Sequence, residues 1–143
     1  MKIMFVGDIN LGEYYPSFGN GPGTFAGDQS VFSGVEEQFK LADMVVGNLE
    51  ASITSEDWDG SNPEKMVLKV SPNVAHHLKS AGFGVMQIAN NHTVQHGEPA
   101  FMESLEILDG MGISAVGINS QEAVVIKDGD ISIGFLAASD VPD

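Results

Sequence analysis

The stretch GVMQIANNHTVQHG, residues 84–97, decides the fold that we predict for this chain. It begins as an apolar run of strand length and then changes abruptly to amide and imidazole side chains. In open α/β sheets, ligands bind at the edge formed by the carboxyl ends of the strands. The stretch therefore predicts an α/β sheet with a polar site where this strand ends.

Two other apolar stretches end in the same manner. Residues 3–6 lead into GDIN at 7–10, and residues 44–46 lead into GNLE at 47–50. If the three strands are parallel neighbours, their polar ends converge. The side chains expected to meet there are those of Asp8, Asn48, Glu50, Asn91 and His92. Carboxylate, amide and imidazole groups together suit a hard or borderline divalent metal, so the sequence predicts a metal site at this edge.

The composition predicts a single globular domain. The chain has 143 residues, of which 43% are hydrophobic, and this is enough to build one core. It contains no cysteine, so disulfides and thiolate ligands are excluded and a metal would be held by oxygen and nitrogen donors.

The net charge of -14 bears on partners and location. It argues against nucleic acid and against an anionic membrane surface, because both are bound through Lys and Arg. A polyanionic substrate would be repelled unless bound cations reversed the local field. Neither a signal peptide nor a membrane span is visible, so the chain as written is expected to be cytoplasmic; it would be membrane-associated or extracellular if an anchor had been removed.

The rest of the chain predicts alternating strands and helices. Strands are expected at 2–7, 43–47, 67–70, 84–89 and 114–117, and helices at about 30–41, 72–81 and 98–110. Residues 123–126 and 131–136 flank an Asp-Gly turn and predict a hairpin. Loops 11–29 and 51–66 are expected to rim the site and to be mobile. The predicted fold class is α/β, with a mostly parallel sheet flanked by helices on both faces and a C-terminal hairpin.

The four histidines are not equivalent in this prediction. His92 follows two amides at a strand end, whereas His96 either adds to the site or lies on the following turn. His76 and His77 fall within an expected helix and are interpreted as surface or packing residues. Motifs for a P-loop, a dinucleotide fold or a nucleophile elbow are absent from the sequence.

Three motifs together carry a family resemblance. VGDINLG at 6–12, ADMVVGNLE at 42–50, and AGFGV at 81–85 leading into ANNHT at 89–93 resemble the bacterial capsule-synthesis proteins of the poly-gamma-glutamate (CapA-like) family. The resemblance extends from about residue 2 to residue 136. It implies a fold similar to calcineurin-like metallophosphoesterases, of which this chain would supply half of the usual two-sheet α/β sandwich.

The resemblance also implies roles for the site residues. Asp8, Glu50, Asn91 and His92 stand where the family has its metal-site residues, and Asn48 lies beside them. Asp8 and Glu50 would hold a divalent metal (Mn, Zn, Mg or Fe), while the catalytic pair would be Asn91, which orients an oxyanion, and His92, a ligand or general acid.

Two departures from the family pattern qualify the resemblance. Gln95 replaces an Asp that family members commonly carry, and no histidine follows His96, whereas family members continue with further histidine motifs. Residues 1–143 are therefore interpreted as a single domain that is the N-terminal part of a longer one, with a degenerate, non-catalytic member as the alternative.

Three functions remain open from the sequence. The first is metal-assisted hydrolysis or transfer at an anionic phosphate-type group in capsule synthesis, acting on an anionic small molecule or a polyglutamate-type substrate. The second is a non-catalytic assembly or binding component of polyglutamate capsule synthesis or export, with capsule-synthesis partners or self-association. The third is a plain α/β binding domain without metal. Bound metal and turnover distinguish the three.

Overall fold

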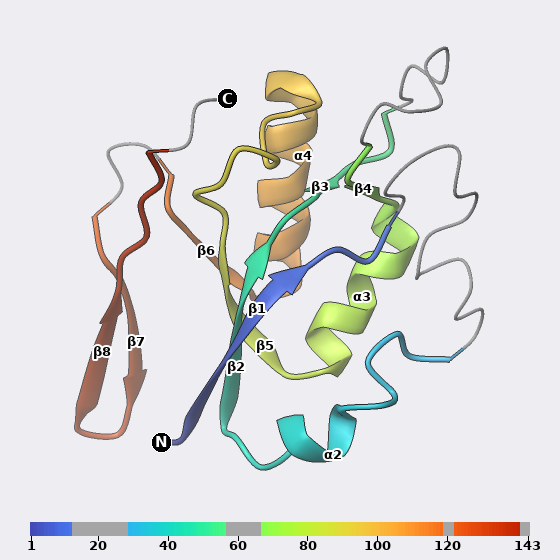
Figure 1. Cartoon of the computed structure of the whole chain (residues 1–143). Helices are drawn as coiled ribbons and strands as arrows, with labels where there is room; N and C mark the ends of the chain where they lie inside the picture. Colours follow the sequence, from blue (N-terminus) through green and yellow to red (C-terminus); the bar gives the residue numbers. More distant parts are fainter. Residues whose placement is uncertain (13–28, 57–66, 119–121, 141–143) are drawn as a thin grey trace.

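The computed structural model describes residues 1–12, 29–56, 67–118 and 122–140 (Figure 1). Its main feature is a four-stranded sheet, named sheet A, in which all neighbouring strands are parallel. The spatial order is β1-β2-β5-β6. The strands are β1 (Ile3–Ile9), β2 (Met44–Leu49), β5 (Phe83–Gln87) and β6 (Ser114–Val116). The parallel α/β sheet predicted from the sequence is confirmed.

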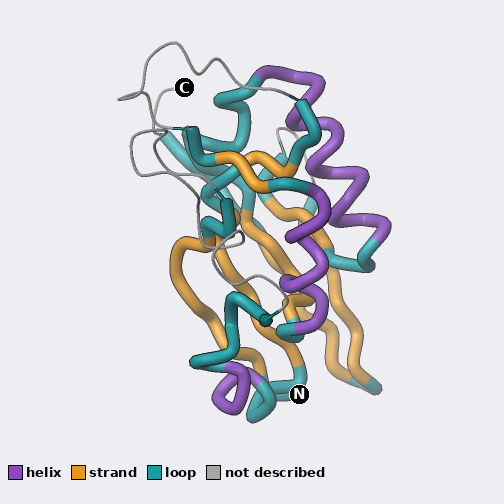
Figure 2. Tube along the Cα trace, turned by 90° about the vertical axis from the view of Figure 1, so that its right-hand side faces the viewer, coloured by secondary structure: helices purple, strands orange, loops and turns teal. Residues whose placement is uncertain are grey.

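Two helices have the ends that their sequences predict. In α3 (Pro72–Ser80), the Ser71 hydroxyl accepts a hydrogen bond from the Asn73 N–H, and Pro72 occupies the first turn, where it costs no helical hydrogen bond. Helix α4 (Gly97–Gly110) follows the polar stretch after β5. Both cover the same face of sheet A (Figures 1 and 2).

The helix expected at 30–41 is much shorter in the structure. Only α2 (Glu36–Phe39) is α-helical, and residues 31–35 form turns. The Ser30 hydroxyl accepts the Phe32 N–H, the same kind of local bond that Ser71 makes at the start of α3, but here it is followed by turns and not by an α-helix. Tertiary packing holds this segment instead, because the Phe32, Phe39 and Phe83 rings lie 5.3–5.8 Å apart between centroids.

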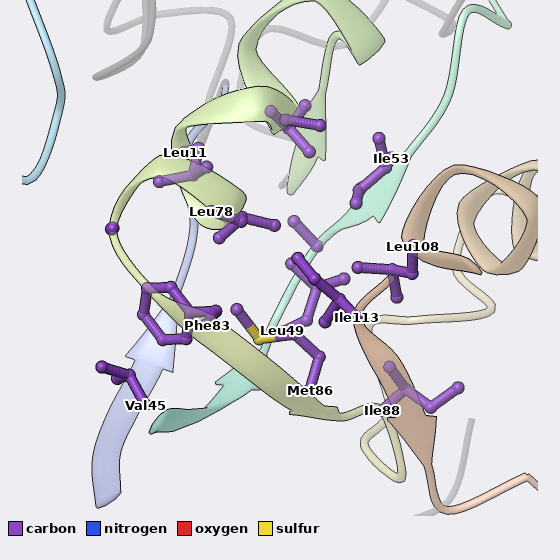
Figure 3. Packing of buried hydrophobic residues seen from close by; sticks show 14 of the residues in the cluster. Leu11, Val45, Leu49, Ile53, Leu78, Phe83, Met86, Ile88, Leu108 and Ile113 are labelled. Carbon is purple, nitrogen blue, oxygen red and sulfur yellow. The ribbon is translucent and has the colours of Figure 1, made fainter. Parts of the chain in front are cut away.

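The larger core lies between sheet A and the helices (Figure 3). Leu49, Phe83 and Met86 of the sheet pack with Leu78 of α3 and Leu108 of α4, and all five are almost fully buried. Burying such side chains stabilises the fold by roughly 1.5–3 kcal/mol each relative to exposure. This core fixes the strands whose ends form the candidate site.

A hairpin, not a helix, covers the opposite face of sheet A in the described part of the chain. It consists of β7 (Val124–Asp128) and β8 (Ile131–Phe135), paired antiparallel as predicted. Phe135 packs in a second, smaller core with Val46 and Val85. Figure 1 shows the hairpin and the helices α3 and α4 on opposite sides of the sheet. The expectation of helices on both faces is therefore not met by the described residues, while the fold class and the hairpin are confirmed.

A short parallel pair of strands extends the structure beyond the carboxyl edge of sheet A. Strands β3 (Ser52–Ile53) and β4 (Lys69–Val70) pair with each other, and β3 packs on α4. The segment after β1 crosses this pair closely. A side chain at Gly12 would clash with the Lys69 carbonyl oxygen, because the added Cβ would lie 1.7 Å from it. Glycine is therefore required at position 12.

Most of the two predicted rim loops, 13–28 and 57–66, lies outside the described residues. Within the described part, no helix has both the length and the apolar character needed to cross a membrane.

Candidate functional site

The candidate site lies where β1, β2 and β5 end. Because the three strands are parallel neighbours, their carboxyl ends share one edge of sheet A (Figure 1). Asp8 lies directly beside Asn48 in the β1–β2 register, and Asn48 lies beside Gln87 in the β2–β5 register. The predicted convergence of these strand ends is observed.

A chain of side-chain hydrogen bonds joins the three strand ends. The Asn48 Nδ2 group donates to Asp8 Oδ1 at 2.7 Å, and the Asn90 Nδ2 group donates to Asn48 Oδ1 at 2.9 Å. Residues more than 80 positions apart in sequence are thereby held within two hydrogen bonds of each other. The Asp8 carboxylate is exposed and the two amides are half-buried.

Asn90 is the anchor of the polar turn after β5. Its Nδ2 also donates to the Leu49 carbonyl at 2.9 Å, which ties the turn to β2. Its Oδ1 accepts the N–H of His92 at 3.0 Å, and the N–H and hydroxyl of Thr93 at 3.1 and 2.9 Å. Both the nitrogen and the oxygen of this amide therefore make hydrogen bonds within the protein. Asn90 thus has a structural role in the site and does not face a ligand.

His92 lies between two amide side chains in the turn that Asn90 anchors. Its Nε2 is 3.3 Å from Asn91 Nδ2, and its Nδ1 is 3.2 Å from Gln95 Oε1. His96 is turned elsewhere, because its Nε2 contacts the Val67 carbonyl oxygen. Two interpretations were open for His96, and this contact agrees with a position on the following turn. The contact connects that turn to the segment before β4.

Glu50 follows β2 at the same edge, and its backbone N–H donates to the Ile9 carbonyl at 3.0 Å. Its carboxylate is half-buried. The two predicted acidic residues thus lie at the carboxyl ends of adjacent strands, Asp8 near the end of β1 and Glu50 directly after β2.

The predicted metal set is not assembled in the described residues. They contain no group of three or more His, Cys, Asp or Glu side chains placed to hold a metal ion. The amide of Asn48 is partly engaged within the protein, because its oxygen accepts from Asn90 and its nitrogen donates to Asp8. The described residues thus show no group already arranged as a metal centre, and Asp8, Asn48, Glu50, Asn91 and His92 stay a prediction as metal ligands.

An apolar cavity of about 230 Å³ adjoins the edge on the hairpin side of sheet A. Phe5, Val46 and Phe135 line it, and the polar residues Asn48 and Gln87 also contribute to its lining. Gln87 Nε2 donates to the Ala89 carbonyl at 2.7 Å, and Gln87 Oε1 is buried with no hydrogen-bond partner among the described residues. Neither Gln87 nor the structural role of Asn90 was predicted. The Asn90-x-x-Thr93 pattern, typical of an Asx-type turn, is the signal that indicates the latter.

The remaining histidines pack as predicted. His77 is buried in α3, its ring centroid 4.2 Å from that of the exposed His76. Burial lowers the pKa of His77, and the neighbouring His76 adds to this effect. Neither residue lies at the carboxyl edge of sheet A.

Comparison with known proteins identifies the family. The model of the family described as "Bacterial capsule synthesis protein PGA_cap" matches residues 2–142. The "PGA biosynthesis protein CapA" of Bacillus subtilis (strain 168) is 28% identical over 117 residues, which is 82% of this chain and 30% of that protein.

Two further relatives extend the comparison. The "Capsule biosynthesis protein CapA" of Bacillus anthracis is 28% identical over 119 residues, and the protein y4sH of Sinorhizobium fredii (strain NBRC 101917 / NGR234) is 32% identical over 96 residues. The matches cover 28% and 21% of these relatives, so the chain spans less than a third of the curated relatives that it matches. The match over residues 2–142 shows that the chain belongs to the bacterial capsule synthesis protein PGA_cap family.

Proposed function

We propose that the carboxyl edge of sheet A is part of a cleft that acts in capsule synthesis, by hydrolysis or transfer at an anionic phosphate-type group. The observation that carries the proposal is the hydrogen-bonded series Asp8–Asn48–Asn90, which joins three strand ends into one polar surface. Family membership supports the biological process, since two relatives are named for capsule or PGA biosynthesis.

Asp8, Asn91 and His92 are the residues of this chain that face such a cleft in the proposed function. Asp8 presents an exposed carboxylate, with one oxygen held by Asn48. Asn91 and His92 present polar groups on a turn whose backbone is fixed by Asn90. A divalent cation belongs to the proposal as a cofactor that would counter the net charge of -14 when an anionic substrate approaches. The cation would need further ligands in addition to Asp8, Asn91 and His92.

Manganese binding tests the cation part of this proposal. Titration of the chain with Mn²⁺, followed by the loss of the free-ion EPR signal, should detect binding that Asp8→Asn weakens by about tenfold or more, which is ~1.4 kcal/mol. Asp130→Asn is the matched control, because it removes the same charge from an exposed hairpin turn and should leave the affinity unchanged. Equal Mn²⁺ binding by the unsubstituted chain and Asp8→Asn would contradict a role for Asp8 in holding the ion.

A second candidate is a non-catalytic component that binds a capsule polymer or an assembly partner at the same edge. The internal hydrogen bonds of Asn48 and Asn90 favour it, because both amides hold the strand ends together and Asn90 has both its nitrogen and its oxygen engaged. Binding of poly-gamma-glutamate without turnover, lost on substitution at the edge, would support this candidate over the hydrolytic one.

A further inference from the structure

The ring of His92 meets a different kind of group at each nitrogen. At Nδ1 it meets the amide oxygen of Gln95 at 3.2 Å, and at Nε2 it meets the amide nitrogen of Asn91 at 3.3 Å. An amide oxygen can only accept a hydrogen bond, and an amide NH₂ group can only donate one. A neutral imidazole has one N–H and one lone pair, so both contacts are satisfied only when the proton is on Nδ1.

The backbone of the turn explains why Gln95 reaches the ring. The Gln95 N–H donates to the His92 carbonyl at 3.3 Å, which brings the two residues to the same side of the turn. The His92 N–H donates to Asn90 Oδ1 at 3.0 Å, which fixes the other side of His92. The side-chain contact between His92 and Gln95 is thus built on a backbone that is held at both residues.

We infer that Gln95 is a positioning residue, which holds neutral His92 with its proton on Nδ1 and its lone pair on Nε2. The consequence is specific: the Nε2 lone pair of neutral His92 accepts from Asn91 in this structure, so Nε2 can act as a proton acceptor or a ligand once Asn91 releases it, and it cannot act as a proton donor. This choice between the two roles rests on the proposed function, whereas the tautomer itself does not.

His96 provides an internal comparison. Its Nε2 faces the Val67 carbonyl oxygen, which can only accept, so neutral His96 carries its proton on Nε2. Two histidines four residues apart therefore have opposite tautomers. The tautomer of His96 is assigned from its contact with Val67 and does not depend on Gln95.

The tautomers can be read directly from imidazole ¹⁵N chemical shifts. The chain labelled with ¹⁵N-histidine is measured without metal, at a pH where the imidazoles are neutral, and the signals are assigned with His92→Gln and His96→Gln. His92 should show the protonated shift at Nδ1 and His96 the protonated shift at Nε2. Gln95→Met has a similar length but no acceptor; because the Asn91 donor at Nε2 still favours the same tautomer, the Nδ1 signal of His92 should move only part of the way toward the unprotonated range. Gln95→Glu keeps an acceptor oxygen at the same reach and should retain the Nδ1–H form.

The His96 signals show whether each variant is folded, since they should not move in either Gln95 variant. A proton on Nε2 of His92 in the unsubstituted chain would overturn the inference. The inference would also be overturned if His92 kept its native ¹⁵N shifts in Gln95→Met while His96 kept its own. Turnover and bound metal do not enter this measurement, so failure of the proposed function and failure of this inference are separate outcomes.

Discussion

Asn90 joins two strands and a turn through one side chain, and its replacement should be costly. Its amide makes hydrogen bonds to Asn48, Leu49, His92 and Thr93, some of them to half-buried or buried groups. Each such bond contributes about 1 kcal/mol net, and more when a buried partner is left unsatisfied. Asn90→Ala is therefore expected to lower the free energy of unfolding by roughly 2–4 kcal/mol.

The neighbouring amide offers a matched control for that prediction. Asn91 contacts the His92 ring at 3.3 Å, and Asn91→Ala should cost less than about 1 kcal/mol. Urea unfolding of both variants, with equal m-values, measures the difference. Equal destabilisation by the two substitutions would show that Asn90 does not have the anchoring role assigned to it.

Side-chain hydrogen bonds connect helix α4 to β3 and to the two residues that follow it; hydroxyl groups and one carboxylate make these bonds. The Ser104 hydroxyl bonds to both the N–H and the carbonyl of Ile53, at 2.8 and 3.0 Å. The Glu103 carboxylate accepts from the Thr54 hydroxyl at 2.5 Å and from the Ser55 N–H and hydroxyl at 3.0 and 2.8 Å. These bonds, with that of Thr54 first, lower the pKa of Glu103 from its ordinary value of 4.5.

A lowered carboxyl pKa makes this contact sensitive to acid. Its stabilisation is fully present above the unfolded pKa near 4.5, and it is lost as the pH falls through the lower, folded pKa. Glu103→Gln should be less stable than the unsubstituted chain near neutral pH, by under about 1 kcal/mol because the group is largely screened by solvent. The difference should shrink in acid.

Urea midpoints measured from about pH 7 to about pH 3 test this dependence. Glu106→Gln, on the exposed side of the same helix, is the control for removing one negative charge. A stability difference for Glu103→Gln that stays constant in acid would indicate that the Glu103 carboxylate is not stabilised by its hydroxyl partners.

The elements differ in how far the sequence could predict them. Strands β1, β2 and β5 contain apolar runs of strand length that are followed by polar residues, so both their existence and their shared edge could be predicted. The β3–β4 pair is only two residues per strand, which is too short for any periodic pattern. The segment before α2 follows local turn bonds and aromatic packing, and helix propensity alone does not describe these.

At the scale of the whole molecule, topology could be predicted better than side-chain partners. The parallel order of sheet A follows from alternating strands and helices, but the position of the hairpin opposite the helices depends on packing between distant residues. The same limit applies to the site. The sequence indicates that Asp8, Asn48 and the residues around His92 meet, but not that Asn48 and Asn90 use their amides on each other. Side-chain hydrogen bonds depend on orientation, which residue type does not specify.

The arrangement of donors leads to a prediction for catalysis by the whole chain. Two-metal phosphoesterase chemistry needs ligands for two ions about 3.5–4 Å apart, which stabilise the attacking and the leaving oxygens. The described residues bring together no group of three His, Cys, Asp or Glu side chains, and neutral amides are weaker ligands than carboxylates and imidazoles. We therefore expect this 143-residue chain to show little or no hydrolysis of an aryl phosphate with added Mn²⁺, Zn²⁺ or Mg²⁺. The measurement is p-nitrophenol release by the unsubstituted chain and by the Asp8→Ala/His92→Ala double variant. Robust metal-dependent turnover that the double variant loses would contradict this expectation and would mean that Asp8 and His92 belong to a metal centre that forms when the ion is present.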